Sequence, residues 1–205
     1  MLGNHIAIPH LMLPGLRNNL LPAGLAFTPV LCLALDLRGD LPLWVGAVSI
    51  VLPSAGVLLA LAAEDGRLAR RLALGLLAGA LATVPYDLLR LTAVALGGLP
   101  ADPVPGFGRA LGVEPAAVGG YLWRYLGDGG GMGMAFCALG LGGGRAGLGF
   151  GMFVSACLLV VLASSAAAQA AMFPLTPVGV GVVVCGHAIW GVSLGAFVAE
   201  GGHHG

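Results

Sequence analysis

Six apolar stretches, each long enough to cross a bilayer, constrain this chain most strongly. A helix needs about 20 predominantly apolar residues to span the hydrocarbon core. Charged residues make up 9% of the chain and the mean hydropathy is +0.97, whereas soluble domains have about 25% charged residues. The pattern predicts an all-α polytopic membrane helix bundle, one integral membrane domain over residues 1–205, with six transmembrane helices near 20–37, 41–63, 72–98, 118–142, 147–171 and 178–199.

Short polar or proline-rich segments separate these stretches. "RGD" at 38–40 predicts a tight turn, "EDGRLARR" at 64–71 a charged loop, and residues 100–116 a proline-rich connector. Residues 1–19 are interrupted by prolines and glycine, so we expect them at the membrane interface or against the bundle. The sequence leaves no segment for a separate soluble domain.

The arginines outside the spans predict the orientation, because cytoplasmic loops of membrane proteins carry an excess of Lys and Arg. Six spans divide these arginines unequally between the two sides. One side holds Arg17, Arg67, Arg70, Arg71 and Arg145, and the other holds Arg38 and Arg109. We therefore expect both termini in the cytoplasm, with the first span acting as an uncleaved anchor.

The stretch "WRYLGDGGGMGM" at 123–134 combines two charges with five glycines. Its glycines match neither the dinucleotide fingerprint nor a Walker A loop. The spacings Gly127/Gly131 and Gly129/Gly133 instead favour close packing between membrane helices. A second interpretation is that the glycines break the helix around Asp128, which is tolerated where the backbone is buried in protein or lines a cavity.

Charged and aromatic residues within the spans predict one polar cluster near the bilayer midplane. Asp87 and Arg90 are three apart and Arg124 and Asp128 four apart, so each pair shares a helix face. Because the third span runs outward and the fourth returns, the two pairs should lie at similar depth. The candidate ligand-binding residues are Tyr86, Asp87, Arg90, Tyr121, Arg124, Tyr125, Asp128 and His187.

The cluster has two interpretations. A charge at the bilayer centre costs about 2.5 to 3.5 kcal/mol on insertion scales, so these residues must be paired. The pairs could form a purely structural network of two Arg balanced by two Asp. Alternatively, they line a pocket in which Arg90 and Arg124 hold a carboxylate or phosphate, with Asp128 or His187 moving a proton.

Metal, cofactor and nucleic-acid functions are not expected. A catalytic zinc needs about three protein ligands, and His187 is the one histidine inside a span, while the four cysteines are isolated. The "GHH" near the C-terminus is expected to bind metal adventitiously at most. The net charge of zero gives no basic face for nucleic acid. "GHAIWGVSLG" at 186–195 is similar to the last helix of a rhomboid protease, but the fourth span lacks the G-x-S-G nucleophile.

"PYDLLRL", "DPVPGFGRALG" and "GHAIWGVSLG" resemble segments of an uncharacterised family of small bacterial six-span integral membrane proteins, over roughly residues 72–199. The matching positions are Tyr86, Asp87, Arg90, Gly186, His187, Trp190 and Gly191. The resemblance implies a bacterial inner-membrane protein but no activity. The family's fourth span has Tyr-His-x-x-Asn-Gly where this chain has "YLWRYLGDGGG", which implies a site rebuilt around Arg124 and Asp128.

Three classes of function remain open. The first is binding or transport of a small anionic or amphipathic ligand. The second is an intramembrane enzyme acting on a lipid or isoprenoid by acid/base chemistry of Asp87, Asp128 or His187. The third is a non-catalytic subunit that packs its glycine faces against partner helices or a second copy in a homo-oligomer. A cavity at the cluster favours the first two, and a dry, fully paired network favours the third.

Overall fold

The structure, a computed structural model, describes residues 19–202, and this part of the chain consists of helices and connections without a strand. Four helices are long and apolar enough to cross a membrane, namely Leu43–Glu64, Gly66–Ala95, Gly144–Ser164 and Pro177–Gly201. The first of them joins α3 (Leu43–Gly46), the π-helical η2 (Ala47–Val51) and α4 (Leu52–Glu64). The all-helical architecture is confirmed and is compatible with an integral membrane protein.

Two of the six predicted spans are not among these four helices. The segment near 20–37 forms α1 (Leu21–Ala26) and α2 (Thr28–Arg38), which meet at Phe27. Prolines in the first turn of each helix lack an N–H and favour a new helix start. The segment near 118–142 forms a continuous rod of α7 (Ala116–Leu122), η3 (Trp123–Gly130) and α8 (Gly131–Ala138). Its charges and glycines lower its hydropathy, so six spans are not confirmed.

The predicted loop at 64–71 is wrong, because most of it is helical. Asp65 separates α4 from α5 (Gly66–Ala95), and its Oδ1 accepts hydrogen bonds of 2.8 Å from Arg67 N and 3.3 Å from Leu68 N. A carboxylate at this position satisfies backbone donors that have no partner in the first helical turn. The arginines that follow therefore belong to the first turns of α5.

Two other boundaries also differ from the sequence prediction. The proline-rich connector contains α6 (Val104–Leu111). The predicted fifth span ends early, since α9 (Gly144–Ser164) stops at Ser164 and the short α10 (Ala166–Ala171) follows. The Ser165 Oγ accepts a 3.1 Å hydrogen bond from Ala168 N, which caps α10 and fixes this break.

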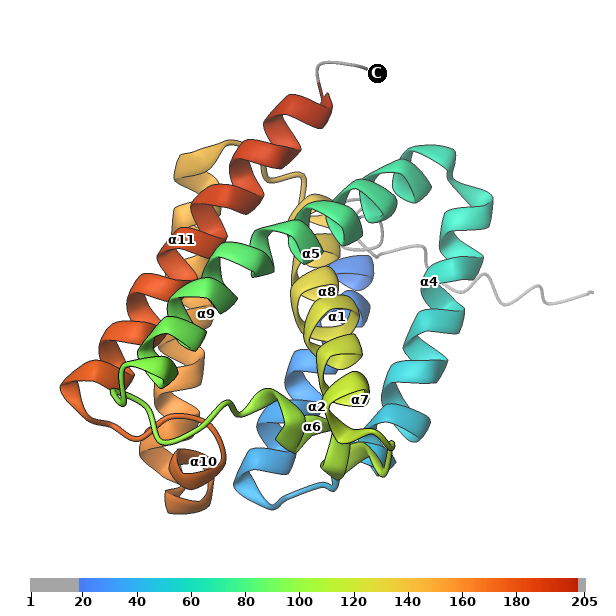
Figure 1. The fold of residues 1–205 in the computed structure, drawn as a ribbon. Helices are drawn as coiled ribbons and strands as arrows, with labels where there is room; N and C mark the ends of the chain where they lie inside the picture. The colour runs from blue at the N-terminus through green and yellow to red at the C-terminus, as the bar shows by residue number, and fades with distance from the viewer. Residues whose placement is uncertain (1–18, 203–205) are drawn as a thin grey trace, which may run out of the picture.

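Glycines hold two pairs of helices in close contact, as the G-x-x-x-G spacings predict. In Figure 1, α5 crosses the centre of the described chain, and α9 lies beside α11 (Pro177–Gly202). A Cβ atom added at Gly133 would lie 2.8 Å from the Cα of Gly79, and one added at Gly151 would lie 3.2 Å from the Cα of Gly191. Backbone therefore meets backbone where α5 contacts α8 and where α9 contacts α11.

The rod formed by α7, η3 and α8 is π-helical around Asp128, but it is not broken. The eight residues of η3 form a π-helix, in which each backbone bond spans one more residue than in an α-helix. The second interpretation, in which the glycines break the helix around Asp128, is therefore wrong. π-Helical turns occur frequently at functional sites, and here the turn carries Arg124 and Asp128 on one continuous helix.

Some predictions concern residues outside the described range. Residues 1–19 are expected at the membrane interface or against the bundle, and the structure describes Asn19 alone of these residues. The histidines at 203–204, for which adventitious metal binding is expected, lie beyond Gly202. The cytoplasmic location of the two termini likewise concerns ends that the structure does not describe.

Candidate functional site

Asp87 lies at the centre of a buried ion-pair network between α5 and η3. Its Oδ1 accepts a 3.1 Å hydrogen bond from Arg124 Nε, and its Oδ2 lies 3.3 Å from Arg90 Nη2. Arg124 Nη1 lies 4.0 Å from Asp128 Oδ2. The structure thus joins all four predicted charged residues, and Asp87, Arg90 and Asp128 are buried.

Asp102 is a fifth member of the network, which sequence reasoning missed. Its Oδ1 pairs with Arg90 Nη1 and accepts a 3.0 Å hydrogen bond from Val104 N at the start of α6. Its Oδ2 accepts a 2.8 Å hydrogen bond from Tyr121 OH. The sequence signal that could have found it is an acidic residue directly before a proline in the connector, a common helix-start pattern. The network therefore holds three carboxylates for two guanidiniums, not the expected two for two.

An aromatic ring separates Arg124 from His187. The Arg124 guanidinium carbon lies 4.5 Å from the centroid of the Tyr86 ring, and the His187 ring meets Tyr86 edge-on at 5.0 Å and 86°. His187 Nδ1 lies 2.8 Å from the Val183 carbonyl oxygen. A carbonyl can only accept, so Nδ1 is the donor, and in the neutral ring Nε2 is left as an acceptor.

The two motifs that carry the family resemblance meet in space. A Cβ atom at Gly186 would lie 2.7 Å from the Tyr86 ring, so glycine at this position lets the ring lie against α11. Trp190 Nε1 donates a 3.4 Å hydrogen bond to the carbonyl of Gly79 on α5. The Tyr-Asp-x-x-Arg and Gly-His-x-x-aromatic-Gly segments therefore form one contact between α5 and α11.

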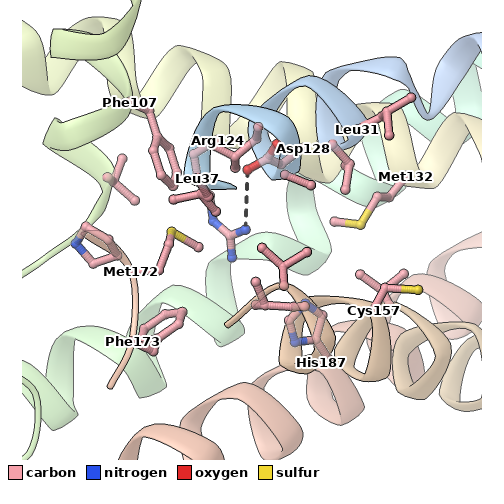
Figure 2. A pocket seen from close by; sticks show the side chains of 18 of the residues that line it. Leu31, Leu37, Phe107, Arg124, Asp128, Met132, Cys157, Met172, Phe173 and His187 are labelled. Carbon is pink, nitrogen blue, oxygen red and sulfur yellow. Dashed lines mark ion pairs between the residues drawn. The ribbon is translucent and has the colours of Figure 1, made fainter. Parts of the chain in front are cut away.

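A cavity of about 240 Å³ adjoins the network. Its polar wall consists of Tyr86, Arg90, Arg124, Asp128 and His187, and the rest of the wall is apolar. Figure 2 shows Arg124 and Asp128 on one side of this space and His187 across from them, with apolar side chains around. The apolar wall includes Leu31, Leu37, Phe107, Leu158, Met172 and Phe173.

The other predicted site residues lie outside the cavity wall. Asp87 sits behind Arg90 and Arg124 and holds both guanidiniums. Tyr121 and Tyr125 line a shallow groove on the outer face of α7 and η3, where their ring centroids lie 6.3 Å apart. Of the eight candidate residues, five therefore face the cavity and three stand behind or beside it.

Some buried polar atoms of the site lack a hydrogen-bond partner within residues 19–202. Asp128 is 4% exposed, and its Oδ1 makes no hydrogen bond in this range. Arg90 Nε, Arg90 Nη2 and Trp123 Nε1 are also buried and make no hydrogen bond in this range. A buried polar group without a partner costs free energy comparable to that of a lost hydrogen bond. Because Asp128 also lines the cavity, a donor bound there would remove this cost.

The described residues offer no group of three or more His, Cys, Asp and Glu side chains arranged to hold a metal ion. Cys32 and Cys137 are buried, while Cys157 and Cys185 are exposed and free. His5, His10, His203 and His204 lie outside residues 19–202. The chemistry visible in the structure is therefore that of two guanidiniums, three carboxylates, an imidazole and the surrounding aromatic rings.

No protein-family model, curated protein or solved structure matches this chain.

Proposed function

We propose that this chain is a six-span protein of the bacterial inner membrane that binds or transports a small amphipathic ligand in the cavity beside Arg124 and Asp128. Helices α1 with α2 and the α7–η3–α8 rod cover the two remaining predicted segments, which supports two more crossings. The arginine distribution supports cytoplasmic termini. The motif resemblance supports membership of the small bacterial family described above.

The proposal rests on the wall of the cavity, which has one polar part and one apolar part. Charged and polar groups gather at one part of the wall, where Arg124, Asp128 and His187 face the space, and apolar side chains form the rest. Small-molecule sites typically combine a mostly apolar lining with a few convergent polar groups. A purely structural ion-pair network would not require such a space. A ligand with a polar head and an apolar body matches both parts of the wall.

The charge balance favours an uncharged head over a carboxylate or phosphate. Arg90 is already held between Asp87 and Asp102, and Arg124 is held by Asp87. With three carboxylates for two guanidiniums, an added anion would increase the excess of negative charge. Such repulsion is strong where water is excluded. Of the anionic and amphipathic ligands expected from sequence, the amphipathic class is therefore the better supported.

A second candidate function is acid/base chemistry on a lipid or isoprenoid within the membrane. The observation that favours it is that Asp128 and His187 both line the same cavity, so a bound substrate could contact an acid and a base together. His187→Asn would then abolish turnover while ligand binding remained, and Asp128→Asn would also abolish turnover. Turnover that survives both substitutions would exclude these two residues as the acid and base.

The binding proposal is tested by thermal unfolding of the full chain in lipid nanodiscs. Single-chain alcohols, amines, carboxylates and phosphates, together with a bacterial lipid extract, are compared for the shift in Tm. We expect uncharged amphiphiles to raise Tm, and Arg124→Gln to remove this increase. Arg38→Gln is the matched control, because Arg38 pairs with Asp40 on an exposed surface far in sequence from the cavity residues of η3. If no compound shifts the Tm of the parent protein, the proposal is wrong.

A further inference from the structure

Exposed residues of α2 and α9 belong to the wall of the cavity, which indicates an opening to the surface between these two helices. Among its lining residues, Leu31 on α2 is 50% exposed and Cys157 on α9 is also exposed. Figure 2 shows Leu31 and Cys157 on the same side of the cavity, opposite Phe107 and Phe173. Phe107 and Phe173 are both buried and close that end. We call the gap lined by Leu31 and Cys157 the side opening.

The surface around the side opening is apolar. On α9, the flanking Phe153 and Val160 are 58% and 67% exposed. The helix is one of the four long enough and apolar enough to cross a membrane. Cys157 lies seven residues before the last residue of α9, Ser164, which is roughly 10 Å along a helix. With α9 crossing the membrane, as the proposed function has it, the side opening faces the hydrocarbon of the bilayer, and a molecule that uses it comes from the lipid phase.

The pair Arg124 and Asp128 fits a hydroxyl group. Arg124 Nη1 and Asp128 Oδ2 are 4.0 Å apart, which is longer than a hydrogen bond. One oxygen atom about 2.8 Å from each would bridge them. A hydroxyl both donates, to the carboxylate, and accepts, from the guanidinium, and it adds no charge. An amine can only donate to this pair when protonated, and a carboxylate can only accept.

The cavity is too small to enclose a long lipid chain. Its volume is about 240 Å³. Drug-sized ligands occupy pockets of about 300 to 1,000 Å³. A long chain bound by its head would therefore extend beyond the cavity, and the side opening provides an apolar path for it.

We propose that the cavity takes a single-chain lipid alcohol from the bilayer, with its hydroxyl between Arg124 and Asp128 and its chain leaving between Leu31 and Cys157. The inference rests on the proposed function and adds to it the class of ligand and its route. Its head group and its route can be tested separately, because a cysteine already lies at the side opening.

The route is tested by the reactivity of Cys157 toward a lipid-permeant maleimide, with the full chain in nanodiscs. Cys185→Ser leaves Cys157 as the exposed thiol within residues 19–202, and Cys157→Ser leaves Cys185 on α11, which does not line the cavity, as the matched control. Dodecan-1-ol is the probe. At a free concentration tenfold above half-saturation, labelling of Cys157 should slow about tenfold, in proportion to the unbound fraction. Labelling of Cys185 should not change.

Each outcome separates the side opening from the proposed function. Equal slowing at both cysteines would show a general effect on the bilayer and would overturn the route. A rise in Tm without protection of Cys157 would leave binding in place and also overturn the route. If no amphiphile raises Tm, the proposed function itself fails.

The head group is tested by comparing dodecan-1-ol with dodecanoate and dodecylamine in the same thermal assay. We expect the alcohol to give the largest shift in Tm, because the other two heads bring a charge. A larger shift with dodecanoate would overturn the hydroxyl assignment and return the site to an anion clamp. A larger shift with dodecylamine would overturn it in favour of a cation held by Asp128.

Discussion

Arg124 Nε donates a 3.1 Å hydrogen bond to Asp87 Oδ1 and thereby joins two helices through residues that are 37 positions apart. The same carboxylate lies 3.3 Å from Arg90 through its other oxygen. Asp87 thus pairs with two guanidiniums at once, and Arg124 has its other carboxylate partner, Asp128, only at 4.0 Å. Loss of this one carboxylate would affect charges on both α5 and η3.

Asp87→Asn should lower the free energy of unfolding by about 3 to 5 kcal/mol, the usual cost of removing one partner from a buried ion pair. Combining it with Arg124→Gln should cost less than the sum of the two single changes, because the uncompensated guanidinium is removed as well. The measurement is reversible unfolding in detergent. Asp40→Asn is the control, since the exposed pair Arg38–Asp40 should contribute about 0 to 1 kcal/mol. Strictly additive effects at Asp87 and Arg124 would contradict the coupled network.

Asp102→Asn should destabilise the protein although this residue lies in a connector. Its carboxylate pairs with buried Arg90 and accepts from Tyr121 OH and Val104 N, so the change weakens the attachment of α6 to α5 and α7. We expect a loss of at least about 2 kcal/mol, because hydrogen bonds to charged groups contribute roughly 1.5 to 3 kcal/mol each.

Glu114→Gln, at an exposed acidic residue of the same connector, is the matched control for Asp102→Asn and should change stability by less than about 0.5 kcal/mol, because the Gln side-chain oxygen can still accept the 3.1 Å hydrogen bond from Ala116 N. Tyr121→Phe removes one hydrogen bond, so its loss of stability, about 1 kcal/mol, should lie between those of Asp102→Asn and Glu114→Gln. Equal stability of the variants at Asp102 and Glu114 would show that Asp102 is not part of the network in solution.

Gly133→Ala should destabilise the contact between α5 and α8. The added Cβ would lie 2.8 Å from the Cα of Gly79, so the helices must separate, at a cost of about 1 to 3 kcal/mol. Gly56→Ala on α4 is the control, because a Cβ there meets nothing within 4 Å. Alanine at that position should stabilise the helix by about 0.5 to 1 kcal/mol. Both are measured by thermal unfolding, and a tolerated Gly133→Ala would contradict the close approach of the two backbones.

The six-span topology predicts that two exposed arginines lie on opposite sides of the membrane. Arg109 lies on α6 in the connector, and Arg67 lies at the start of α5. In a background with Cys157 and Cys185 replaced by serine, Arg109→Cys should react with a membrane-impermeant maleimide added outside intact cells. Arg67→Cys should react after the cells are opened. The reverse pattern would overturn the orientation, and reaction of both from outside would overturn the number of spans between them.

The sequence by itself determined the helical rods and much of their packing. Long apolar runs bounded by proline, glycine and charged residues form helices because the backbone must bond internally in an apolar medium. The glycine spacing at Gly129/Gly133 predicted a close helix contact, since residues four apart share a helix face, and both glycines lie against the backbone of Gly79. Local spacing also paired Asp87 with Arg90, because three residues make nearly one helical turn.

Tertiary structure alone decided which of these groups form the site. Asp102 reaches Arg90 because the chain turns back toward α5 before α6 begins, and no local periodicity records such a contact. Arg124 and Asp128 lie 4.0 Å apart on the π-helical turn of η3, whereas their spacing in the sequence predicted only that they share a helix face. The cavity itself is the space that remains when α2, α6 and α9 pack around these residues. Its size and its side opening depend on side chains far apart in the sequence, so the pattern of residues along the chain could not supply them.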